Sequence, residues 1–74
     1  MANPIQERYA DALLERISND RFPSVTQMNL FEYVASREQL AVYLLHLMDR
    51  IDQERNPSVP LLLRVQRLIA RFGT

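Results

Sequence analysis

The 74-residue chain contains no cysteine, no lysine and no tryptophan, and its only glycine is Gly73. Without cysteine, neither a disulfide nor a thiolate metal site can stabilise so small a core. Without glycine-rich segments, the usual phosphate-binding loops are excluded. No apolar run approaches the length of a membrane span, and no basic leader with an apolar segment opens the chain. These absences predict a cytoplasmic protein without a membrane span, held together by apolar packing.

The formal net charge is zero, with nine arginines and nine acidic residues. A neutral chain is not expected to bind nucleic acid through bulk charge. The charges are unevenly placed, however, because residues 1–54 hold nine acids and five arginines, a net of −4. Residues 55–74 hold four arginines and no acid, a net of +4.

A short stretch recurs almost unchanged, as DRFPSV at residues 20–25 and as ERNPSV at residues 54–59. Displacement of the chain by 34 residues extends the match to eight identities in 27 pairs, between residues 9–35 and 43–69. Chance gives about two identities at average residue usage, so the sequence predicts an internal duplication. The period equals that of tetratricopeptide repeats. The chain does not fit that family, because the repeat's glycine is absent and the prolines fall inside each unit.

Apolar residues recur at helical spacing in two stripes per half, with a polar stretch between the stripes. The predicted stripes of the first half are Ala10, Leu13, Leu14 and Ile17, followed by Met28, Phe31, Val34 and Ala35. Those of the second half are Leu44, Leu47, Met48 and Ile51, followed by Leu62, Val65, Leu68 and Ile69. Each polar stretch contains a proline, which disfavours helix at the preceding residue.

The pattern predicts an all-α single domain of four helices, at about 4–20, 24–35, 37–55 and 58–72. They form two duplicated helical hairpins, about 4–35 and 37–72, in a pseudo-two-fold relation. Ser24 and Ser58 are the predicted N-caps of the second and fourth helices, and Ser36 with Gln39 forms a predicted capping box for the third. The third helix contains LAVYLLHLM, which is apolar nearly all round. We therefore expect it to be the most buried element.

Catalytic and metal-binding patterns are sparse. His46 is the only histidine, and Asp49 is the single acid at helical spacing from it. The acids between residues 49 and 54 lack the central glycine of a calcium loop and alternate with arginines. We therefore expect no enzyme, no catalytic residue, no metal site and no cofactor.

The two halves differ most on one helical face. Leu30, Tyr33 and Arg37 lie at i, i+3 and i+7 beside the core stripe of the first half. The equivalent positions of the second half hold Arg64, Arg67 and Arg71. Aromatic and arginine side chains concentrate binding energy at protein interfaces. These six residues are the candidate partner-binding residues of a small non-enzymatic interaction module, whose partner is another protein or a second copy in a homodimer.

Two other interpretations stay open. In the first, the arginines form a solvated face, and Leu30 and Tyr33 fill a flank of the core. In the second, the fourth helix is the recognition helix of a DNA-binding or transcription-associated protein, because three arginines on one face reach phosphates. The neutral net charge argues against the second interpretation.

Overall fold

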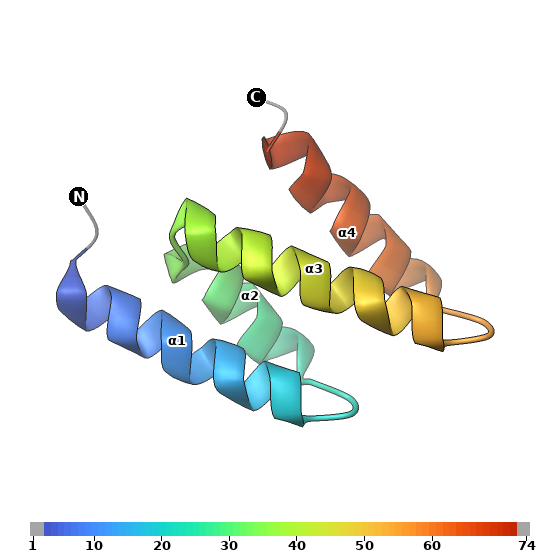
Figure 1. Ribbon diagram of the computed structural model, residues 1–74, viewed down its shortest axis with the longest axis horizontal. Helices are drawn as coiled ribbons and strands as arrows, with labels where there is room; N and C mark the ends of the chain where they lie inside the picture. The colour runs from blue at the N-terminus through green and yellow to red at the C-terminus, as the bar shows by residue number, and fades with distance from the viewer. Residues whose placement is uncertain (1–2, 73–74) are drawn as a thin grey trace. The chain divides into compact units, whose positions relative to one another are not determined.

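The computed structural model describes residues 3–72, which form four α-helices and no β-strand (Figure 1). The helices are α1 (Pro4–Asn19), α2 (Val25–Val34), α3 (Arg37–Gln53) and α4 (Val59–Phe72). The predicted all-α class and the four helices are thus confirmed. Each predicted helix end lies within about two residues of the observed one, the usual uncertainty of a helix terminus.

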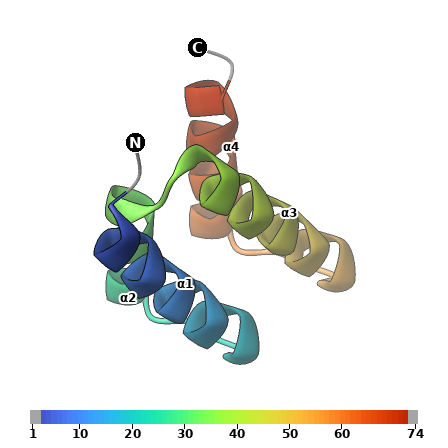
Figure 2. The ribbon, with the colours of Figure 1, turned by 60° about the vertical axis from the view of Figure 1, so that its left-hand side comes forward.

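The chain divides into two compact units, residues 1–41 and 42–74, and the boundary lies inside α3. The first unit holds α1, α2 and the first residues of α3, and α1 packs against α2 (Figure 2). The predicted hairpins place a boundary slightly earlier, at the connection between α2 and α3. The difference arises because Gln39 and Leu40, at the start of α3, are both buried.

The apolar residues of the first unit form the predicted stripes. The buried ones are Ala10, Leu13, Ile17, Met28, Phe31 and Leu40. Ile17 and Phe31 have no exposed surface, and burial of each side chain contributes about 1.5–3 kcal/mol. Leu14 and Val34 are half-buried, at the margins of the stripes. Ala35 follows the end of α2 with an extended backbone and does not belong to its stripe.

In the second unit, the buried apolar residues are Tyr43 and Leu47 of α3 and Val65 and Leu68 of α4. Three residues of the predicted stripes are instead exposed: Met48, Leu62 and Ile69. The sequence pattern therefore overstated the width of the buried face. A helix with a narrow buried stripe exposes residues that lie about a quarter turn away from it.

Among the described residues, α3 has more buried side chains than any other helix, as predicted: Gln39, Leu40, Tyr43 and Leu47. It is not buried all round, however. Val42, Leu45 and Met48 of α3 are all exposed, Leu45 by 64%. These residues lie away from the stripe of Tyr43 and Leu47, because successive residues turn by about 100° around a helix axis. An apolar composition nearly all round the helix thus does not translate into burial all round.

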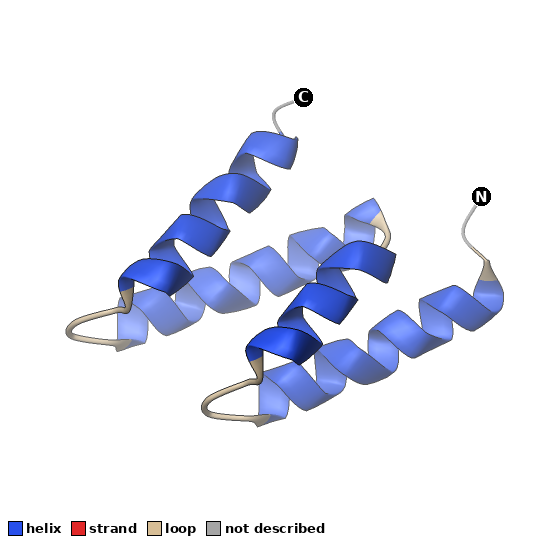
Figure 3. Cartoon of the chain, turned by 180° about the vertical axis from the view of Figure 1, so that it is seen from behind, coloured by secondary structure: helices blue, strands red, loops and turns tan. Residues whose placement is uncertain are grey.

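Turns of equal length follow α1 and α3, at residues 20–24 and 54–58 (Figure 3). The last turn of α1 closes with a hydrogen bond from Asp20 N–H to the Arg16 carbonyl, 3.1 Å long. The last turn of α3 closes with the equivalent bond from Glu54 N–H to the Arg50 carbonyl, 3.0 Å long. In both turns the residue before the proline, Phe22 or Asn56, lies outside a helix, as steric repulsion from the ring of Pro23 or Pro57 favours.

Serine side chains cap the helices that follow. Ser24 Oγ accepts a hydrogen bond from Gln27 N–H at 3.3 Å, and Ser58 Oγ accepts one from Leu61 N–H at 3.2 Å. Both predicted N-caps are therefore confirmed. Each satisfies one of the amide groups that the first turn of a helix leaves without an internal partner.

The predicted capping box of α3 is also present, with both of its hydrogen bonds. Ser36 Oγ accepts from Gln39 N–H at 3.2 Å, and Gln39 Oε1 accepts from Ser36 N–H at 2.8 Å. The reciprocal pair starts α3 at Arg37, with only two residues between it and the end of α2 at Val34.

Candidate interaction surfaces

The first candidate surface lies on α2. Tyr33 is 89% exposed and Leu30 is 45% exposed, on the side of α2 away from the buried Met28 and Phe31. Such exposure is incompatible with the interpretation in which Tyr33 fills a flank of the core. Exposure of a large aromatic ring to water is unfavourable. Aromatic residues are enriched at the interfaces where proteins bind each other.

Arg37 does not continue this surface as the sequence spacing suggested. The helix α2 ends at Val34, and Ala35 has an extended backbone with φ −69° and ψ 143°. Arg37 is instead the first residue of α3. The spacing i, i+3, i+7 places residues on one face only within a continuous helix, so the predicted grouping of Arg37 with Leu30 and Tyr33 is corrected.

The second candidate surface lies on α4, which holds Arg64, Arg67 and Arg71 within one continuous helix. Arg67 and Arg71 are exposed, and Arg64 is half-buried. The spacing i, i+3, i+7 therefore forms a row along α4, as predicted from the sequence. Because α4 contains no acidic residue, no carboxylate of the same helix neutralises the row.

A shallow hollow of about 620 Å³ adjoins this row. Its lining residues all belong to α4: Pro60, Leu63, Arg64, Gln66, Arg67 and Ala70. Leu63 is 57% exposed, so the hollow combines an apolar side chain with two guanidinium groups. This combination suits a partner helix that carries carboxylates beside small or apolar residues.

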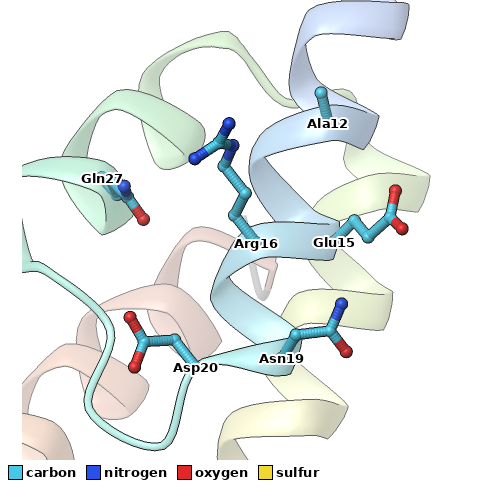
Figure 4. A pocket seen from close by; sticks show the side chains of 6 residues that line it. All are labelled: Ala12, Glu15, Arg16, Asn19, Asp20 and Gln27. Carbon is cyan, nitrogen blue, oxygen red and sulfur yellow. The ribbon is translucent and has the colours of Figure 1, made fainter.

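A second hollow, of about 590 Å³, lies beside the turn between α1 and α2 (Figure 4). Figure 4 shows the Arg16 side chain extending toward Gln27 of α2, whereas Glu15 points to the other side of α1. Asn19 and Asp20 complete the rim at the end of α1. The lining mixes one cation, two carboxylates and two amides, so it favours no ligand of a single charge.

One polar network was not predicted from the sequence. Gln39 is 8% exposed, and its Nε2 donates to the Glu7 carbonyl at 3.0 Å and to Asp11 Oδ1 at 2.8 Å. Nearby, Gln6 Nε2 donates to the Val34 carbonyl at 2.9 Å. The two glutamines thus join α1 to the connection between α2 and α3. The only sequence signal was the capping box, which placed Gln39 at a helix start but could not locate α1 beside it.

An exposed apolar stripe on α3 was likewise missed. Val42, Leu45 and Met48 follow one another at three-residue spacing and are all exposed. Their spacing could have been recognised from the sequence, but the apolar run around them concealed it. Exposed apolar residues that adjoin each other mark possible interaction surfaces.

The described residues offer little support for other site types. His46 is half-buried on α3. Within residues 3–72, no group of three histidine or acidic side chains is arranged to hold a metal ion. None of the helices formed by those residues combines the length and the apolar character needed to cross a bilayer.

Together, the four helices and their exposed faces define a small all-α protein with candidate binding surfaces on α2, α3 and α4. No known protein family matches the chain, and no curated protein or solved structure is significantly similar to it. Its function is therefore inferred from its own residues.

Proposed function

We propose that this chain is a small non-enzymatic protein–protein interaction module that binds through the exposed face of α2. The observation that carries the proposal is the 89% exposure of Tyr33, beside the 45% exposure of Leu30. Tyrosine supplies large contact area at a low cost in conformational entropy and is frequent among the residues that dominate binding energy. The partner is another protein or a second copy of the chain, and the cytoplasm is the predicted location.

The test compares binding by the wild type, by Leu30→Asp and by Tyr33→Asp, with the purified chain immobilised as bait and partners identified by mass. A partner captured by the wild type should be lost with both variants, while the helical content measured by circular dichroism stays unchanged. Ile5→Asp is the matched control, because Ile5 is 81% exposed on α1. The same partners bound by all variants would contradict the proposed face.

A second candidate function is DNA binding through α4. The row of Arg64, Arg67 and Arg71 on one helix supports it. Guanidinium groups on one face of a helix that lies against DNA can contact the backbone phosphates. Binding to a random DNA duplex at low salt should then fall with Arg64→Glu and with Arg67→Glu. Equal and negligible binding by the wild type and by both variants would remove this function.

We also infer that the two hairpins arose by duplication of one ancestral hairpin. Eight identities in 27 aligned pairs support this origin. The matched turns support it as well, because the last bond of the preceding helix and the serine cap of the following helix recur 34 residues apart. Under this inference, each pair of equivalent positions began with the same residue and later diverged. The pairs Leu30/Arg64 and Tyr33/Arg67 have diverged on the exposed face, so we infer that these positions serve the function.

A further inference from the structure

The helix α3 carries an exposed apolar stripe that ends beside two carboxylates. Val42, Leu45 and Met48 are exposed by 56%, 64% and 41%. Asp49 and Asp52 are also exposed and lie near the end of the same helix. All five residues belong to the second compact unit and to one helix, so the surface that they form depends on α3 alone.

The two carboxylates continue the apolar stripe. Asp49 lies four residues beyond Leu45, and Asp52 lies four residues beyond Met48, so each acid follows an apolar residue about one turn later. At about 100° per residue, the stripe and the acids together cover about 120° of the helix circumference. The buried Tyr43 lies on the other side, about 160° away from Leu45. We call this combined surface the α3 face.

The charges of the α3 face are placed unfavourably for the helix itself. Carboxylates near the C-terminus of a helix meet the negative end of the macrodipole. Asp49 and Asp52 also repel each other, because residues three apart are neighbours on a helix surface. Arg50, the basic residue of the last turn, is half-buried and lies about 100° around the helix from Asp49, outside the α3 face. A cation brought to the α3 face from outside would relieve both effects.

We propose that the α3 face binds a helix of another protein whose docking face combines apolar residues with arginine or lysine. The apolar residues of the partner pack on Val42, Leu45 and Met48, and its cations pair with Asp49 and Asp52. A second α3 offers no cation on its own face, so the charges favour a basic partner over a second copy. This surface is separate from the face of α2, and the inference goes beyond the proposed function.

Both parts of the α3 face are needed for binding. Exposed ion pairs alone contribute little, because each pair is screened by water and salt. The apolar stripe adds surface that a partner removes from water, and the flexible side chain of Met48 adapts to the shape of the partner. From Val42 to Asp52 the face extends about 15 Å, so a partner helix of about three turns covers it. A contact of this size, below about 1,200 Å² in total, is typical of weak and transient complexes.

Fluorescence anisotropy with two designed peptides tests the proposal. The basic probe is a labelled helical peptide with leucines along one face and arginines beside them, and the acidic probe has glutamate in place of every arginine. The full chain should bind the basic probe at least about tenfold more tightly at about 0.1 M salt. The difference should shrink at about 1 M salt, because the Debye length falls from about 10 Å to about 3 Å.

Two variants separate the charges from the stripe. Asp49→Arg with Asp52→Arg should reverse the preference, so that the acidic probe binds more tightly than the basic one. Its matched control is Glu7→Arg with Glu15→Arg, the same change of charge at exposed positions of α1, which should keep the preference of the wild type.

Leu45→Gln removes apolar surface without a change of charge and should weaken binding of the basic probe by at least about fivefold. Ile5→Gln is its matched control, because Ile5 is 81% exposed on α1, and it should bind like the wild type. Circular dichroism verifies that every variant keeps its helices.

Three outcomes overturn the proposal. The first is a wild-type chain that binds neither probe or binds both equally. The second is a basic-probe preference that persists in the variant with both aspartates replaced. The third is self-association, measured by sedimentation equilibrium, that Leu45→Gln abolishes, because the occupant of the α3 face is then a second copy. Tyr33→Asp should bind the basic probe like the wild type, so failure of the α2 proposal and failure of this one are distinguishable.

Discussion

Gln39 is the residue that ties together the most distant parts of the first unit. Its amide nitrogen donates to two groups of α1, and its amide oxygen accepts from Ser36 N–H in front of α3. The side chain is buried, so these bonds are made away from bulk water. A buried polar residue with its partners satisfied specifies one arrangement of the helices around it.

Replacement of this side chain should therefore be costly. Gln39→Ala leaves Ser36 N–H, the Glu7 carbonyl and Asp11 without their partner, and we expect a loss of about 1–3 kcal/mol in the free energy of unfolding. Urea denaturation followed by circular dichroism measures it. Gln53→Ala, an exposed glutamine at the end of the same helix, should change the stability by less than about 0.5 kcal/mol. Equal stabilities of the two variants would contradict the structural role of Gln39.

Asp20 and Glu54 occupy equivalent positions in the two turns but differ by one methylene group. Asp20 Oδ1 accepts from Phe22 N–H at 3.1 Å, which forms a compact turn after α1. The aspartate side chain has the right length for this bond, whereas glutamate holds its carboxylate farther from the backbone. The shorter residue is thus the better one at this position.

Asp20→Glu and Glu54→Asp should have different effects on the stability of the chain. Asp20→Glu should destabilise the chain by about 0.5–1 kcal/mol, because the bond to Phe22 N–H is lost. Glu54→Asp should leave the stability unchanged or raise it by up to about 0.5 kcal/mol, since the shorter carboxylate reaches Asn56 N–H. The free energy of unfolding in urea measures both. Destabilisation of similar size by both variants would show that the two turns do not share one local structure.

Among the elements, the turns and caps were the most predictable. Pro23 and Pro57 restrict the residue before them, and Ser24, Ser36 and Ser58 bond to amides only three residues away. These interactions are local, so the sequence pattern contains all the groups that take part in them. The bounds of the four helices followed from the same signals.

The burial of individual residues was less predictable, because it depends on where other helices lie. Tyr9 and Tyr43 occupy equivalent positions in the predicted repeat, yet Tyr9 is 45% exposed and Tyr43 is fully buried. Ile69 belongs to the same apolar pattern as Leu68, yet only Leu68 is buried. The contact of Gln39 with α1 joins residues 28 and 32 positions apart, and no local pattern encodes it. Of the candidate surface residues, Leu30 and Tyr33 are exposed, which the sequence pattern had left open. Arg37 was grouped with them on one helix face, but it belongs to the next helix.

Because Ser24 and Ser58 cap α2 and α4 in the same way, the loss of either cap should destabilise the chain. Ser24→Ala and Ser58→Ala each remove one bond to the first turn of a helix, and each should lower the stability by about 0.5–2 kcal/mol. Ser18→Ala is the control, because Ser18 lies inside α1, where alanine is the better helix former. The helical signal in circular dichroism and the free energy of unfolding should both fall in Ser24→Ala and Ser58→Ala, but not in Ser18→Ala. A control variant that is as unstable as the cap variants would refute the capping role.

The whole molecule has a small core and a large apolar surface. Ten apolar residues are buried within the described residues 3–72, whereas thirteen large apolar residues in that range are exposed by 40% or more. A chain of this length is expected to be stable by only about 4–10 kcal/mol. Association that covers part of the exposed surface would therefore add a large fraction of the total stability, because binding to the folded state alone shifts the folding equilibrium.

This coupling leads to a prediction for thermal unfolding. If the folded chain self-associates through the exposed face of α2, the melting temperature should rise by about 3 °C or more for each tenfold increase in protein concentration. The rise should disappear in the Tyr33→Asp variant, studied in the same buffer, because its folded monomers no longer associate. Salt changes the stability of monomers as well, so the comparison at constant salt isolates the contribution of association. A melting temperature independent of concentration in the wild type would mean that its small core suffices alone and that its exposed apolar residues are reserved for a different partner.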